Sequence, residues 1–180
     1  MSGAISKPRV LIVYYSRTGN TESVAQGLSR AMGADLEAIE DVASRRGIWG
    51  YLRAGYEGTF GRSASIRAAR HEPRNYDLVL IGSPTWNAAL CSPVRAYLER
   101  YGSALSDVAF FATCGGRGAD KVLRQMAELT GRKPLAQLTL TERDLKGRFA
   151  VYLAEFVEEL MKLWDARATQ PDHGALAAAP

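Results

Sequence analysis

Six consecutive residues at the end of the first apolar run of the chain form a pattern suited to binding an anion. Four of them carry a hydroxyl or amide group, one is a glycine that lets the backbone turn close to a ligand, and one is an arginine. The run opens into an amphipathic stretch, and the free N–H groups and dipole of a helix N-terminus attract anions. Helix capping explains one or two such residues but hardly four. The run therefore predicts a phosphate-binding loop of Ser16, Arg17, Thr18, Gly19, Asn20 and Thr21.

The chemistry of this loop also indicates the kind of phosphate. The loop contains no lysine, so neutral donors would hold the anion. That favours a monophosphate over a triphosphate with magnesium. The spacings GxxxxGK[ST] and GxGxxG, which are typical of nucleoside triphosphate and dinucleotide sites, are both absent from the chain.

The elements around the loop alternate short apolar runs with amphipathic stretches, which is typical of a parallel sheet wrapped by helices. The near-continuous apolar character of residues 9–15 and 77–81 favours strands covered on both faces. Residues 35–40 alternate acids with apolar residues, so we expect an edge strand with Leu36, Ala38 and Ile39 inward. Further strands are predicted at 108–112 and 135–140, and helices at 20–32, from 92, at 119–129 and at 144–164. The fold class is therefore α/β.

Length and composition bound the protein class. A chain of 180 residues with 47% hydrophobic and 23% charged residues predicts one soluble domain, at residues 1–165, and a disordered tail at 166–180. The apolar runs are too short to cross a bilayer, and residues 1–8 do not resemble a signal peptide. Cys91 and Cys114 do not have a CxxC or metal-ligand spacing, so we expect no metal and a cytoplasmic location.

The net charge of +4 is concentrated in one segment. Residues 42–76 contain seven arginines and only two acids, together with the aromatic residues Trp49, Tyr51, Tyr56 and Phe60. The pattern at 48–56 is compatible with a short helix. No nucleic-acid-binding motif accompanies the arginines, so we expect no nucleic-acid partner. A solvated arginine-rich surface is the favoured interpretation, and a site for an acidic partner or phosphorylated co-substrate is the alternative.

The loop at residues 16–21 resembles the fingerprint of the flavodoxin family, Ser/Thr-x-Thr-Gly-Asn-Thr after the first strand, with Arg17 at the variable position. The resemblance extends over about residues 9–164. It implies FMN as the cofactor, with its phosphate held by this loop. It also implies a doubly wound, five-stranded parallel sheet in the order 2-1-3-4-5, with helices on both faces and FMN at the switch point.

The resemblance further implies a flavin-binding loop after each of two later strands. Residues 82–87 supply the first, in which Trp86 would stack on the flavin and Asn87 stands where a backbone carbonyl approaches it. Residues 113–118 supply the second, whose three glycines let backbone amides come close. A second stacking aromatic is missing, which leaves one flavin face open or covered from residues 42–76. The candidate contacts are Pro84, Thr85, Trp86, Asn87, Cys114, Gly115, Gly116 and Arg117, of which Arg117 can equally face solvent.

No side chain of the sequence stands out as catalytic. A thiol nucleophile of the CxxxxxR type is excluded, because Asp120 lies six residues after Cys114 and Tyr97 lies six after Cys91. His71 and His173 are distant from the loops in sequence. A site without a catalytic side chain favours redox chemistry carried by the flavin itself.

Two functions remain open, and a third is disfavoured. An electron carrier with a redox partner protein is favoured, because the protein then needs only to tune the flavin. The alternative is an FMN-dependent NAD(P)H oxidoreductase acting on quinones or similar acceptors, which an open flavin face and the arginines would suit. The intact loop disfavours a module that has lost FMN. The pI near 9.2 departs from the acidic surface usual among flavodoxins, so their docking partners do not carry over.

Overall fold

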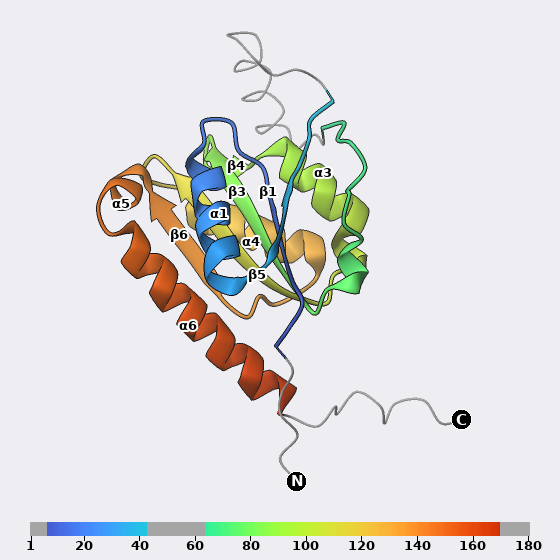
Figure 1. Ribbon diagram of the computed structural model, residues 1–180. Coiled ribbons are helices and arrows are strands. Elements are labelled where there is room, and N and C mark those ends of the chain that lie inside the picture. The colour runs from blue at the N-terminus through green and yellow to red at the C-terminus, as the bar shows by residue number, and fades with distance from the viewer. Residues whose placement is uncertain (1–6, 43–63, 170–180) are drawn as a thin grey trace.

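The computed structural model describes residues 7–42 and 64–169. Their five long strands form one parallel, twisted sheet in the order β2-β1-β3-β5-β6 (Figure 1). This is the doubly wound order 2-1-3-4-5, and the expectation is confirmed. A short sixth strand, β4, pairs antiparallel with the end of β3 and was not expected. The strands are β1 (Val10–Tyr14), β2 (Asp35–Ala38), β3 (Leu78–Trp86), β4 (Ala89–Leu90), β5 (Asp107–Cys114) and β6 (Gln137–Thr141).

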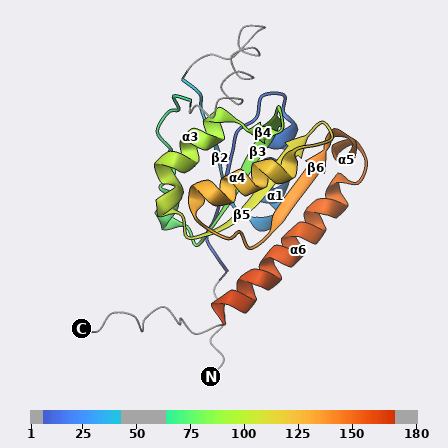
Figure 2. The same ribbon diagram turned by 180° about the vertical axis from the view of Figure 1, so that it is seen from behind.

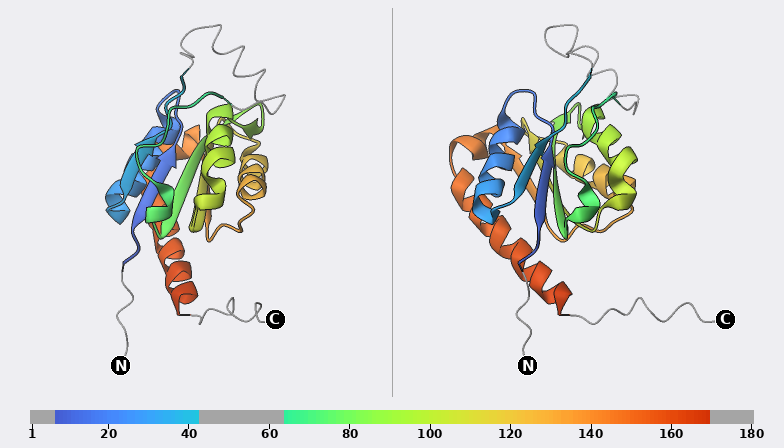
Figure 3. Two further views of the ribbon diagram at one scale, coloured as in Figure 1. Left: turned by 90° about the vertical axis from the view of Figure 1, so that its right-hand side faces the viewer. Right: turned by 45° about the vertical axis from the view of Figure 1, so that its right-hand side comes forward.

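Helices cover both faces of the sheet, which gives three layers (Figures 2 and 3). Helices α1 (Asn20–Met32) and α6 (Phe149–Ala168) lie on one face. Helices α3 (Ser92–Tyr101) and α4 (Ala119–Thr130) lie on the other. Every residue of β1 is buried, as the continuous apolar run predicts for a strand between two helical layers.

The alternation of side chains along β1 divides the core in two. Leu11 and Val13 pack into the cluster under α3 and α4, whereas Ile12 and Tyr14 pack into the cluster under α1 and α6. Burying one such aliphatic side chain contributes about 1.5–3 kcal/mol. Both clusters therefore fix the positions of the carboxyl ends of the strands, where the candidate loops begin.

The predicted helix at 20–32 is confirmed to the residue, and Gly33 ends it with φ of +63°. The single helix predicted at 144–164 is wrong. The chain instead forms α5 (Glu142–Lys146), leaves helical geometry at Gly147, and starts again in α6. Thr141 starts α5 with a capping box, in which its hydroxyl accepts from the N–H of Asp144 and the Asp144 carboxylate accepts from the N–H of Thr141.

The prediction for the edge strand β2 is confirmed for Leu36 and Ile39, which pack into the core, and wrong for Ala38. Ala38 is exposed, and Glu37 is buried with 7% of its surface accessible. Residues 64–76, which we call the strap, lie along the free edge of β2 and contain the short 3-10 helix η1 (Pro73–Asn75). Glu37 is buried because the strap supplies hydrogen-bond donors to its carboxylate.

The tail predicted at 166–180 begins too early, because residues 166–168 are the end of α6. Residues 170–180 and the pattern at 48–56 lie outside the described residues. Within residues 7–42 and 64–169, no helix is long and apolar enough to span a bilayer. No group of three His, Cys, Asp or Glu residues in the same two ranges is placed to hold a metal ion.

The capping box of α5 makes a pH-dependent contribution that can be measured. Hydrogen bonds from Thr141 to the Asp144 carboxylate lower the pKa of Asp144 below its ordinary value of 3.8. The stabilisation is therefore complete above the unfolded pKa and disappears as the pH falls through the folded one. We expect Asp144→Asn to lower the unfolding temperature at pH 7, and the difference from the wild type to shrink as the pH falls below the ordinary carboxyl value of 3.8. Glu142→Gln, in the same turn, controls for the lost charge, and an equal effect of both variants would rule out the capping box as the cause.

Candidate functional site

Three loops from distant parts of the sequence meet at the carboxyl edge of the sheet. They follow β1, β3 and β5, whose ends lie side by side (Figure 1). The Thr21 and Thr113 hydroxyls lie 2.8 Å apart and are buried, which ties the start of α1 to the end of β5. A Cβ at Gly118 would lie 2.6 Å from the Cβ of Ala88, so the loop after β5 packs on the turn after β3. The three predicted loops are thus brought together.

The loop after β1 leaves the N-terminus of α1 without a side-chain cap. Gly19 is the N-cap residue with φ of +93°, a conformation that favours glycine. The first helical bond runs from the N–H of Ser23 to the carbonyl of Gly19, 2.8 Å away, so the preceding three N–H groups have no partner within the helix. Nothing lies within 4 Å of a Cβ built at Gly19. The space beside the N-cap residue is therefore open, as an anion site at this helix end requires.

The predicted phosphate-loop residues differ in what their side chains do. Arg17 and Thr18 are exposed, and Asn20 is half-buried. Ser16 is half-buried and its hydroxyl accepts from the N–H of Gly19 at 3.1 Å, which leaves its own proton free. Thr21 is buried, with 1% of its surface accessible, and bonds Thr113. Thr18 therefore has the most accessible hydroxyl of the loop, and Thr21 is a link to β5.

The second predicted loop is mostly strand. Residues 82–86 continue β3, and only Asn87 and Ala88 form the turn, with φ of 48° and 53°. Positive φ at both central residues is the two-residue hairpin turn that matches the twist of its strands. The N–H of Leu90 donates to Oε1 of Gln125 at 2.8 Å, which anchors this hairpin to α4.

The hairpin presents Trp86 at the carboxyl edge. The indole is half-buried and packs edge to face on Tyr15, with the ring centroids 5.6 Å apart and an interplanar angle of 88°. Thr85 carries a buried hydroxyl with no partner in the described part of the chain, whereas Pro84 is half-buried. Thr85 and Trp86 are consecutive in β3, so their side chains lie on opposite faces of the strand, and Trp86 is the one whose ring packs on Tyr15.

The loop after β5 offers backbone rather than side chains. Gly115 and Gly116 are exposed, and nothing lies within 4 Å of a Cβ built on either. Cys114 is buried with 7% of its surface accessible, so its thiol belongs to the core, and Arg117 is exposed. A hollow of about 680 Å³ adjoins the two glycines and is bounded on its other side by residues of β6 and α5 from 141 to 146.

No family model matches the sequence, and no curated protein matches it. Several solved structures do resemble the fold of this chain, over most of their length. A flavoprotein in complex with FMN from Lactobacillus acidophilus NCFM is 21% identical, with a TM-score of 0.65 over 77% of this chain and 97% of that one. A putative flavoprotein from Bacteroides eggerthii is 20% identical, with a TM-score of 0.66 over 91% and 99%. A flavodoxin, WrbA-like protein from Agrobacterium tumefaciens is 14% identical, with a TM-score of 0.56 over 91% and 99%. The chain has the flavodoxin-like fold.

Within this flavodoxin-like fold, one acid lies close to the anion site. Glu22 is in the first turn of α1, where its charge opposes a bound phosphate. Its carboxylate accepts from the Tyr14 hydroxyl at 3.4 Å and from the Gln26 amide at 3.3 Å. Burial and the nearby Glu22 charge raise the pKa of Tyr14, so this phenol stays a donor. These two bonds tie the Glu22 carboxylate to Tyr14 of β1 and to Gln26, one turn further along α1.

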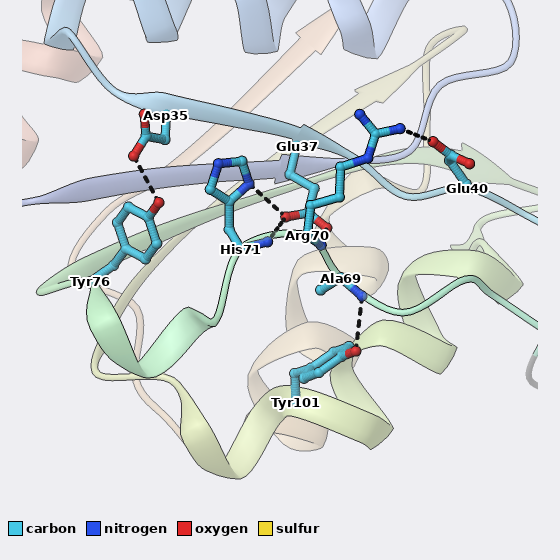
Figure 4. Close-up of polar contacts among 8 residues, drawn as sticks. All are labelled: Asp35, Glu37, Glu40, Ala69, Arg70, His71, Tyr76 and Tyr101. Atoms are coloured by element: carbon cyan, nitrogen blue, oxygen red, sulfur yellow. Dashed lines mark hydrogen bonds and ion pairs between the residues drawn. The ribbon is translucent and has the colours of Figure 1, made fainter.

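The described arginines of the strap are ion-paired, and Figure 4 shows one of these pairs, Arg70 with Glu40. Arg67 and Arg70 both contact the Glu40 carboxylate, and Arg74 lies 3.3 Å from that of Glu72. These side chains are largely exposed, so each pair contributes little stability. The remaining arginines of the basic segment, together with Trp49, Tyr51, Tyr56 and Phe60, lie outside the described residues. The described part of this segment fits the solvated, structural interpretation.

Sequence reasoning placed Thr113 in a predicted loop but missed its bond to Thr21. It also missed Ala88 and Gln125, which have no chemical signature of their own and act through contacts with residues distant in sequence. The role of His71 was missed as well, because its partner Glu37 is 34 residues away. Gly118 was predicted as part of the loop at 113–118, but its contact with Ala88 has no signal in the sequence.

Proposed function

We propose that this chain binds FMN at the carboxyl edge of β1, β3 and β5 and acts as an electron-transfer flavoprotein. The observation that carries the proposal is the uncapped N-terminus of α1 beside the hydroxyl-bearing loop, at the point between β1 and β3 where the strand order reverses. In open α/β sheets, ligands bind at this switch point. One similar solved protein is a flavoprotein in complex with FMN, which supports FMN as the ligand.

The residues present fit the parts of FMN. Free N–H groups at the start of α1, with Ser16 and Thr18, would hold the phosphate. Trp86 would stack on the ring system, and Gly115 and Gly116 leave room for their N–H groups to approach its polar edge. When bound, FMN supplies one- and two-electron redox chemistry. The chain would bind the cofactor, exclude water from one side of it and set its electrostatic surroundings.

One observation favours the NAD(P)H oxidoreductase as a second candidate. The loop after β5 carries no aromatic side chain, and its two glycines border the hollow of about 680 Å³. A nicotinamide would need such an uncovered approach to the flavin.

Titration of the purified chain with FMN tests the proposal. We expect a dissociation constant of about 1 µM or below, a perturbed flavin absorption spectrum and quenched flavin fluorescence. Trp86→Leu should bind FMN more weakly and quench it less, because the stacking ring is lost. Absence of binding at about 100 µM FMN would overturn the proposal. Oxidation of NADH or NADPH with a quinone, at a rate well above that of free FMN, would select the oxidoreductase over the carrier.

A further inference from the structure

A cavity lies between the strap and β2, away from the cofactor loops. Strap and strand pair as β-structure where Asp41 bridges Ile66, and farther along, at residues 67–70, the two segments border a cavity of about 220 Å³. The lining consists of residues 37–40 of the edge strand and its extension, residues 66–70 of the strap, and Tyr97 of α3. Figure 4 shows the contacts around this region.

The contacts beside the cavity hold the strap in place. The Glu37 carboxylate accepts from the N–H of Arg70 at 2.9 Å, and from the N–H and Nδ1 of His71, both at 2.9 Å (Figure 4). The N–H of Ala69 donates to the Tyr101 hydroxyl at 3.0 Å. Donors from two consecutive residues, Arg70 and His71, thus converge on the buried Glu37 carboxylate. These bonds fix the position of the strap at the side of the cavity.

Tyr97 brings an unused hydrogen-bonding group to this wall. The residue is 2% exposed, and its buried hydroxyl has no partner in the described part of the chain. Burial and the negative charge of Glu37 raise the pKa of Tyr97, so the phenol stays protonated and able to donate. A phenylalanine would fill the same place in the core without burying an unsatisfied group. The hydroxyl therefore needs a partner that residues 7–42 and 64–169 do not provide.

We propose that this cavity binds a small neutral molecule with a hydroxyl group, which accepts a hydrogen bond from Tyr97 and donates one to Glu37. Oε1 of Glu37 accepts one bond from the protein and has capacity for another. Arg67 and Arg70 also line the cavity, but both are paired with Glu40, so the Glu37 carboxylate disfavours an anion beside it. Ile39, Ile66 and Ala69 offer apolar contact to the rest of the ligand. A cavity of about 150 Å³ holds a benzene molecule, so 220 Å³ has room for a phenol-sized ligand.

Phenol is the probe, and toluene and benzoate are matched ligands that lack the hydroxyl or carry a negative charge. Titration into the ¹⁵N-labelled full chain should shift the amide signals of Ala69, Arg70 and His71, with phenol binding at least fivefold more tightly than either control. Tyr97→Phe should lower phenol affinity at least fivefold. Tyr152→Phe, which removes a hydroxyl on α6 across the sheet, should leave it unchanged.

The proposal would be overturned if phenol bound no more tightly than toluene. It would also be overturned if Tyr97→Phe bound phenol as tightly as the wild type does. A crystal structure grown with phenol that shows only ordered water in the cavity would overturn it too. Thermal unfolding gives a second readout, since phenol should raise the unfolding temperature of the wild type but not that of Tyr97→Phe. None of these results depends on FMN.

Discussion

Thr18→Ala is expected to weaken FMN binding about 10- to 100-fold and to leave riboflavin binding nearly unchanged. Thr18 has the most accessible hydroxyl of the loop before α1, where it can donate to a phosphate. A hydrogen bond to a charged group contributes about 1.5–3 kcal/mol, which corresponds to this range of affinity. Riboflavin lacks the phosphate and therefore reports every other contact. The measurement is fluorescence titration of both ligands into both proteins.

Thr21 supplies the matched variant for this experiment. Its hydroxyl is buried and bonded to Thr113, so Thr21→Val removes a link between α1 and β5 while keeping the shape of the side chain. We expect a loss of stability of about 1–2 kcal/mol, and an affinity loss that is similar for FMN and riboflavin. An equal loss of both ligands in Thr18→Ala would contradict the assignment of the loop to the phosphate.

The parts of the fold that depend on local signals could be predicted from the sequence. The helix at 20–32 was predicted to the residue because glycines stand at both of its ends and its apolar face is regular. Helix α5 was missed because its start depends on a reciprocal bond between Thr141 and Asp144, which resembles an ordinary polar turn in sequence. The β3–β4 hairpin was missed because its turn is Asn87-Ala88, without the glycine that usually marks this turn type.

Long-range contacts decide what the sequence pattern leaves open. Alternation along residues 35–40 placed Ala38 inward, because an acid is expected to face water. The structure buries Glu37 instead, since N–H groups of Arg70 and His71 reach it from the strap. Likewise, the three candidate loops were each predicted from their residue types, but the bond between Thr21 and Thr113 joins residues 92 apart and carries no local signal.

Gly118→Ala is expected to lower the free energy of unfolding by about 3–5 kcal/mol and to weaken FMN binding at the same time. The glycine has φ of +92°, and a Cβ there would lie 2.6 Å from the Cβ and 2.7 Å from the Cα of Ala88. The left-handed conformation alone costs a side chain about 1–2 kcal/mol. The overlap adds to this cost because it involves backbone, which can give way only if the hairpin that carries Trp86 moves. Urea unfolding and FMN titration measure the two effects.

Gly131→Ala separates the contribution of backbone conformation from that of the contact. Gly131 ends α4 with φ of +62°, and nothing lies within 4 Å of a Cβ built there. Its replacement should cost about 1 kcal/mol and leave FMN affinity unchanged, because only the conformational term applies. If the two variants lose equal stability, the loop after β5 does not pack on the β3–β4 turn. If Gly118→Ala loses stability but keeps full FMN affinity, the position of Trp86 relative to Gly115 and Gly116 has no part in holding the cofactor.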